Sequence, residues 1–107
     1  MASNLDPKVE QITKTLKEAF APSRLFLFGS RANGTHRADS DYDFVMVVPD
    51  LKNRHSAEVK ARSLILNQHA VSADIFIYSD KDFNSWKDEL SSIPETALNT
   101  GKELDLG

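Results

Sequence analysis

Three short apolar runs, separated by segments with helical periodicity, constrain the fold of this chain more than any other feature. The runs occupy residues 25–28, 44–48 and 73–78. Each is rich in β-branched, leucine or aromatic side chains and is bounded by polar residues, glycine or proline, a pattern that is typical of buried strands. The sequence therefore predicts three buried strands.

The segments around these runs have the spacing and the end signals of helices. Before the first run, Asp6-Pro7 indicates an N-cap and a first-turn proline, and the helical pattern ends near Ala21. A second helix is expected over about 56–68, and a last short helix over about 94–101.

A further helix is expected directly after the third apolar run. Ser79 and Asp82 resemble a capping box, with Ser79 as the N-cap residue. The helix that follows should bury Phe83, Trp86 and Leu90. Because helices and strands are interleaved, we expect a two-layer domain with helices packed against a small sheet.

Composition limits the class of protein. The chain has 107 residues, which suits a single domain over residues 1–107. Its formal net charge is −3, which does not favour an extended nucleic-acid surface. It has no cysteine, no apolar run long enough to span a membrane, and no apolar signal core in its first residues. We therefore expect a cytoplasmic protein.

Three aspartates, Asp39, Asp41 and Asp43, lie directly before the second apolar run. In an extended chain, Asp41 and Asp43 point to the same side, roughly 6–7 Å apart. Two such carboxylates repel each other unless a cation lies between them, and magnesium prefers oxygen ligands. A solvated acidic loop is the simpler alternative. A calcium-binding loop is disfavoured, because Phe44 stands where that loop needs glycine.

A Gly29-Ser30 pair directly follows the first apolar run. Glycine permits a sharp turn and a close approach of the backbone. If a helix begins at Ser30, its free amides face any anion at the end of the strand, while Ser30 adds a hydroxyl and Arg31 a positive charge. The alternative is an ordinary turn between a strand and a helix.

A third carboxylate lies in the third apolar run. Asp74 is the one charged residue between Val71 and Ser79, and a buried carboxylate without a partner is costly. If the third strand lies beside the second, Asp74 can join Asp41 and Asp43 around the same metals. The alternative is an aspartate at a sheet edge that faces water.

Together these residues suit phosphoryl-type transfer. The turn at Gly29 would hold a triphosphate, and two metal ions flanked by three carboxylates would activate an incoming hydroxyl for in-line attack. Asp74 is the candidate that accepts the proton of the hydroxyl or binds the metal that lowers its pKa.

The pattern resembles the nucleotidyltransferase superfamily that includes polymerase β. The matching features are Gly29-Ser30, ten intervening residues, Asp41-Tyr42-Asp43, a strand, and an aspartate in a later strand. The length resembles that of the minimal nucleotidyltransferases, called MNT-domain proteins. The resemblance implies an α+β fold with a small mixed sheet.

The same resemblance implies a role for each site residue. Gly29 and Ser30, with Arg31 beside them, would bind the triphosphate of ATP. Asp41 and Asp43 would bind two Mg²⁺ ions, and Asp74 would complete the catalytic and metal site. One position departs from the pattern: many minimal members have a second arginine where this chain has Asn33, which removes a positive charge near the phosphates.

The resemblance also implies a partner. Minimal members are typically paired with a helical HEPN-domain protein, often a ribonuclease toxin. The partner is either adenylylated (AMPylated) on a hydroxyl, or bound and blocked by contact. We therefore expect either a metal-dependent protein adenylyltransferase that acts as an antitoxin or, in a different class, a non-catalytic binding module. A partner or an oligomer would complete the cleft.

Overall fold

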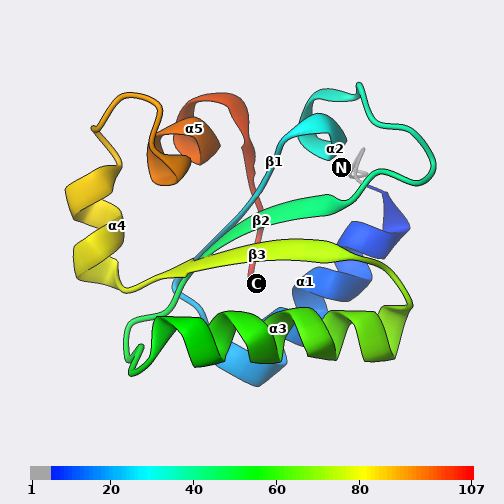
Figure 1. Cartoon of the computed structure of the whole chain (residues 1–107), viewed down its shortest axis with the longest axis horizontal. Helices are drawn as coiled ribbons and strands as arrows, with labels where there is room; N and C mark the ends of the chain where they lie inside the picture. Colours follow the sequence, from blue (N-terminus) through cyan, green and yellow to red (C-terminus); the bar gives the residue numbers. More distant parts are fainter. Residues whose placement is uncertain (1–5) are drawn as a thin grey trace.

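The computed structural model describes residues 6–107 and shows helices on both faces of a small twisted sheet (Figure 1). The elements follow one another in the order α1 (Pro7–Phe20), β1 (Arg24–Phe28), α2 (Ser30–Asn33), β2 (Tyr42–Val47), α3 (Arg54–His69), β3 (Ala73–Tyr78), α4 (Asp80–Trp86), α5 (Ile93–Thr100) and β4 (Lys102–Glu103). The three predicted strands and the predicted helices are thereby confirmed.

The sheet is mixed, with the strand order β3-β2-β1-β4. β1 pairs antiparallel with β2 and with β4. β2 and β3 run parallel and are connected through α3, since parallel neighbours need a crossover. The α+β class and the small mixed sheet packed with helices are confirmed.

Local end signals position the helices as predicted. The Asp6 carboxylate accepts a hydrogen bond from the Lys8 backbone N–H at 2.8 Å, and Pro7 occupies the first turn of α1. The Ser79 hydroxyl oxygen accepts a hydrogen bond from the Asp82 backbone N–H at 3.1 Å and caps α4. These caps fix where the chain leaves the sheet and where it returns.

Side chains alternate between the two faces of the sheet, and each face has its own apolar core. The face toward α1 and α3 carries the larger cluster, which includes Leu25 and Leu27 of β1, Phe44 and Met46 of β2, and Ile75 and Ile77 of β3. The face toward α4 and α5 carries Phe26, Val45, Val47, Tyr78, Phe83 and Ala97. Residues of β2 and β3 that fall between the larger-core positions therefore point toward the α4/α5 face.

The prediction for the helix after Ser79 was right for one side chain and wrong for two. Phe83 is buried and stacks on Phe26, with ring centroids 5.5 Å apart. Trp86 is 50% exposed and Leu90 is 88% exposed. The reason is that α4 ends at Trp86, so the helical spacing that should have turned Leu90 inward does not continue that far.

Strand β4 was not predicted, because it has two residues and neither is apolar. It is held at the sheet edge by the Arg24 guanidinium, which donates two hydrogen bonds to the Glu103 carboxylate at 2.9 and 2.8 Å. Within residues 6–107, none of the helices has the length and apolar character that crossing a bilayer requires.

Candidate active site

Two of the predicted site residues lie side by side on neighbouring parallel strands. Asp43 of β2 is the register partner of Asp74 of β3. Both alternate with larger-core residues and therefore point to the α4/α5 face. The pair lies near the amino-terminal ends of both strands, where the loop before β2 and the turn before β3 enter the sheet. The condition stated for Asp74, that the third strand lies beside the second, is met.

Gly29 packs directly against Asp43. Phe28 is the register partner of Asp43 across the antiparallel β1–β2 pair, so the turn that follows β1 passes beside the aspartate. A Cβ added at Gly29 would lie 2.5 Å from Oδ2 of Asp43. Gly29 also has φ 74° and ψ −158°, a backbone conformation that is essentially restricted to glycine. The predicted turn is therefore placed against the predicted carboxylate.

The predicted helix after the turn is the single-turn α2, with Gly29 as its N-cap and Gly34 as its C-cap. Ser30 is its first residue and is partly exposed. Its start therefore lies where β1 ends, next to Asp43. The structure thus brings Gly29, Ser30, Asp43 and Asp74 to one end of the sheet.

Asp41 lies just before β2 and is exposed. Burial, and then the negative charges of Asp74 and Asp41, raise the pKa of the Asp43 carboxyl above its ordinary value. The two other aspartates thus act on Asp43. Asp39 is exposed on the loop before them.

Arg31 lies on the other side of the sheet. Its guanidinium stacks over the Tyr42 ring at 4.2 Å from the ring centroid, and Tyr42 belongs to the larger core beneath α1. Its NH2 group donates hydrogen bonds to the backbone carbonyls of Ser40 at 2.9 Å and Ala38 at 3.2 Å. Through these hydrogen bonds, Arg31 stabilises the loop that leads to the aspartates.

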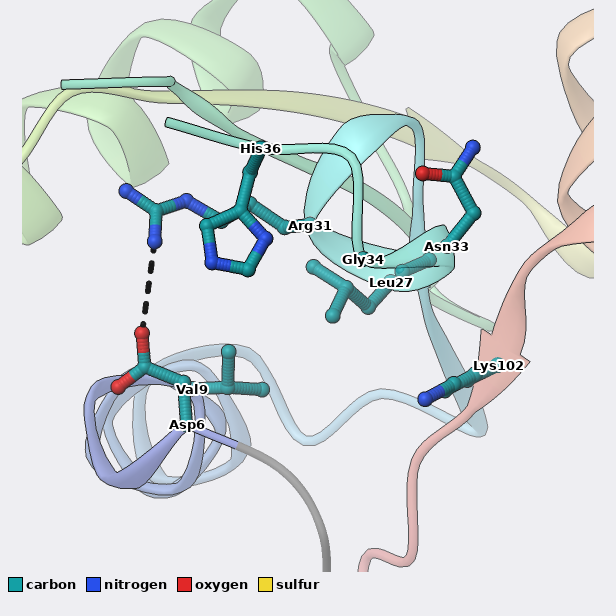
Figure 2. Close-up of a pocket in the computed structure, with 9 residues that line it drawn as sticks. Asp6, Val9, Leu27, Arg31, Asn33, Gly34, His36 and Lys102 are labelled. Carbon is teal, nitrogen blue, oxygen red and sulfur yellow. Dashed lines mark ion pairs between the residues drawn. The ribbon is translucent and has the colours of Figure 1, made fainter. Parts of the chain in front are cut away.

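The same guanidinium faces α1, where its NH1 group lies 3.6 Å from Oδ2 of Asp6 (Figure 2). The Tyr42 hydroxyl donates a hydrogen bond to that carboxylate at 2.8 Å. The sequence reading assigned no role to Tyr42. A structural role for Tyr42 could have been inferred from the alternation of side chains in β2, because Tyr42 and Asp43 point to opposite faces of the sheet. A direct contact of Arg31 with nucleotide stays a prediction.

The donor set suits a hard divalent cation. Asp41, Asp43 and Asp74 supply carboxylate oxygens only, the ligand type that magnesium prefers. Among the ion pairs within residues 6–107, none involves these three aspartates. In the same part of the chain, no three His, Cys, Asp or Glu side chains are gathered as a ready-made metal site. The assignment of metal to these aspartates therefore stays a prediction.

Two half-buried aromatic rings on the same face were not predicted as part of the site. Phe28 of β1 and Phe76 of β3 have ring centroids 6.1 Å apart. Phe28 lies across from Asp43, and Phe76 is two residues beyond Asp74. Both occur in apolar runs, so the sequence indicated only burial. Their alternation with larger-core residues is the signal that places them beside the carboxylates.

Comparison with known proteins gives one match that covers nearly the whole chain. The family model described as a nucleotidyltransferase domain matches residues 9–106. This range contains the turn at Gly29, the three aspartates and all four strands. A search of the curated proteins finds none that matches.

Proposed function

This chain belongs to the nucleotidyltransferase domain family, and we propose that it transfers AMP from ATP to a hydroxyl group of a partner protein. Membership of the family makes the chain a nucleotidyltransferase that acts on a nucleoside triphosphate. The finer assignment of a protein hydroxyl as acceptor is the proposal.

The observation that carries the proposal is the juxtaposition of Asp43 with Asp74 and Gly29. The register places the two carboxylates side by side, and the missing side chain of Gly29 lets the turn approach Asp43. A triphosphate lying along this turn would bring its α-phosphorus near the carboxylates. The reacting phosphorus would then lie beside the carboxylates of Asp43 and Asp74 at one end of the sheet.

The transfer itself needs little covalent chemistry from the protein. The acceptor oxygen attacks the α-phosphorus of ATP, the bond from that phosphorus to the bridging oxygen breaks, and pyrophosphate leaves. Asp74 lies on the strand beside Asp43, and it would either accept the proton of the hydroxyl or hold the metal that lowers the pKa of the hydroxyl. Gly29 and Ser30 hold the triphosphate in line with the attack.

Asp41, Asp43 and Asp74 would hold Mg²⁺, two ions in the arrangement we propose. The bound ions would neutralise phosphate charge and favour the ionised hydroxyl. The raised pKa of Asp43 supports this assignment, because burial and then the charges of Asp74 and Asp41 disfavour its ionised form, and a bound cation would offset these effects.

We further propose that the partner is a helical HEPN-domain protein and that the chain acts as its antitoxin in the cytoplasm. What supports a protein acceptor is the exposure of the site: Asp41 is exposed, and Asp43 and Asp74 are only half-buried at the end of the sheet, so that an acceptor on another protein can approach them. A partner, or a second copy of the chain, would complete the cleft.

The deciding experiment is mass spectrometry of a candidate HEPN-domain partner, encoded beside this chain, after incubation with the protein, ATP and Mg²⁺. We expect a mass gain of one or more AMP units. The double variant Asp41→Ala/Asp43→Ala should give none, while Asp39→Ala, a substitution in the same loop, should retain the gain. Circular dichroism of each variant would show that the fold is intact.

The outcomes separate the two classes of function. No mass gain with any ribonucleotide, together with tight binding of the partner by both wild type and the double variant, would overturn the enzyme proposal in favour of neutralisation by contact. A gain that persists in the double variant would overturn the assignment of the carboxylates.

A further inference from the structure

Strand β3 forms one border of the sheet, since the strand order is β3-β2-β1-β4 (Figure 1). The Tyr78 carbonyl accepts a hydrogen bond from the Val48 backbone N–H at 2.9 Å, so the backbone of Tyr78 is directed toward the neighbouring strand. Because this direction alternates along a strand, the backbone N–H and C=O groups of Ala73, Ile75 and Ile77 point away from the sheet.

This outward row of backbone groups is satisfied at one end only. Oε2 of Glu58, on α3, accepts a hydrogen bond from the Ile77 backbone N–H at 3.0 Å. Within residues 6–107, the outward groups of Ala73 and Ile75 have no hydrogen-bond partner. β3 also contains neither lysine nor proline, which commonly protect an edge strand. The part of the edge beside Asp74 is therefore open to pairing with another extended chain.

Helix α3 supplies an exposed apolar side chain along the same edge. Glu58 marks the side of α3 that faces the edge, and a spacing of four residues continues along that side to Leu66, which is 57% exposed. α3 and β3 run in opposite directions (Figure 1). Eight helical residues span about 12 Å and the three strand residues from Ile77 back to Asp74 about 10 Å, so Leu66 lies near the level of Asp74.

We propose that an extended segment of the acceptor protein pairs with this open edge of β3 and places its hydroxyl residue opposite Asp74. The inference rests on the proposed function and specifies how the acceptor is held. The outward groups of Ala73 and Ile75 select an extended chain over a helix, because only an extended chain presents free backbone donors and acceptors at the matching spacing.

The two faces of such a segment would meet different surroundings. A residue opposite Asp74 has its Cβ about 4.5–5.5 Å from that of the aspartate and on the same face of the sheet, so its hydroxyl can reach the carboxylate. Its neighbours in the segment point to the other face, where an apolar side chain can cover Leu66. The edge therefore favours a segment in which a hydroxyl residue is flanked by apolar residues.

The capped heptapeptide EVTVTVE is a suitable probe. It reads the same in both directions, and when extended it presents threonine hydroxyls on one face and valines on the other. Binding is measured without ATP, by titration of the ¹⁵N-labelled protein and observation of its amide NMR signals. We expect a Kd of about 0.1–1 mM, with shifts at Leu66, Asp74, Ile75 and Phe76.

Two N-methylated forms of the peptide test the backbone pairing itself. One is methylated at the threonine nitrogens and the other at the valine nitrogens. An antiparallel and a parallel arrangement differ in which of these two sets of N–H groups faces β3. We therefore expect one form to bind at least about tenfold more weakly and the other to bind nearly as well as the unmodified peptide.

The matched variants are Leu66→Gln and Leu90→Gln, two substitutions of exposed leucines. Leu90 is 88% exposed and follows α4, away from the open edge. Leu66→Gln should weaken binding of the peptide by about three- to tenfold, because an apolar contact is lost. Leu90→Gln should leave binding unchanged. Both side chains are exposed, so neither substitution should disturb the fold, which circular dichroism would check.

Three results would overturn the inference. In the first, both N-methylated peptides bind as well as the unmodified one, or both lose binding equally. In the second, the shifted amides lie away from β3 and α3. In the third, the β3 amides shift with protein concentration in the absence of peptide, which would show that a second copy of the chain occupies the edge.

The peptide experiment is independent of the transfer reaction. Transfer of AMP to the partner protein without peptide binding at β3 would overturn this inference and leave the proposed function standing. Peptide binding at β3, with no transfer to the partner protein, would support the pairing and overturn the proposed function.

Discussion

Asp43 and Asp74 lie directly across from each other on two parallel strands. Like charges at such positions destabilise a sheet, so this pair costs folding free energy. Burial, Asp74 and Asp41 together raise the pKa of Asp43. The arrangement is therefore unfavourable for the fold taken by itself, which is a frequent property of reactive sites.

Asp43→Asn should consequently stabilise the metal-free protein while abolishing transfer. We expect the free energy of unfolding at neutral pH to rise by about 0.2–1 kcal/mol, because one like-charge contact is removed. Because the folded pKa is raised, the penalty is absent below the ordinary pKa of aspartate and develops as the pH rises through the folded pKa. Denaturant unfolding in the presence of a chelator measures it. Asp39→Asn is the control, and an equal gain there would contradict the prediction.

Gly29→Ala should impair both folding and transfer. The new Cβ would lie 2.5 Å from Oδ2 of Asp43, and the residue would have to adopt φ 74°. We expect a loss of about 1–3 kcal/mol in the free energy of unfolding from the backbone conformation alone. Gly34→Ala is the matched control, since it has φ 81° but nothing within 4 Å of the added Cβ. Loss of transfer in Gly29→Ala alone would show that this turn needs glycine, through its backbone conformation or its contact with Asp43; equal loss in both variants would argue against the importance of that contact.

Arg31→Ala should loosen the loop that leads to the aspartates. The substitution removes hydrogen bonds to the carbonyls of Ala38 and Ser40 and the stacking on Tyr42. We expect a loss of about 1–3 kcal/mol in the free energy of unfolding. Arg31→Lys should recover little of it, because lysine lacks the planar fork of donors. If Arg31→Ala instead weakens ATP binding with unchanged stability, the direct contact with nucleotide predicted from the sequence is favoured.

Asp6 should make the stability depend on acid pH. A hydrogen bond from the Lys8 backbone N–H lowers the pKa of Asp6, and the Tyr42 hydroxyl and the Arg31 charge lower it further. A lowered folded pKa means that the charged carboxylate contributes stability above the unfolded pKa, and that this contribution is lost as the pH falls through the folded pKa.

Two substitutions at Asp6 separate its charge from its cap. Asp6→Asn keeps an N-cap side chain, whereas Asp6→Ala removes it and should cost about 1 kcal/mol. The difference between wild type and Asp6→Asn in the free energy of unfolding should shrink toward acid pH. A difference that is independent of pH would show that the charge of Asp6 has no role.

The sequence predicted the strands, and it singled out Gly29, Asp43 and Asp74, which the structure brings together, because both features leave strong local signals. Apolar runs bounded by polar residues locate the strands, and alternation within a strand separates Asp43 from Tyr42. Pairing of the second and third strands was stated only as a condition for Asp74 to join the other aspartates, and the register of Asp43 with Asp74 fulfils it.

Other features depend on contacts between distant segments and leave no local signal. The contacts of the Arg31 guanidinium with Tyr42 and Asp6 were not predicted, and its contact with the phosphates stays a prediction. Trp86 and Leu90 were assigned to the core because their spacing suits a helix that in fact ends at Trp86. The two-residue β4 depends on pairing with β1, which a pattern of two polar residues does not indicate.

The two faces of the sheet differ in what they carry. The face toward α1 and α3 holds the larger apolar cluster, while Asp43 and Asp74 lie on the other face, at the end away from α4. Residues around the carboxylates can therefore be substituted without changing the larger apolar core. Substitutions around Asp43 and Asp74 should disturb the larger apolar core less than substitutions on the α1/α3 face.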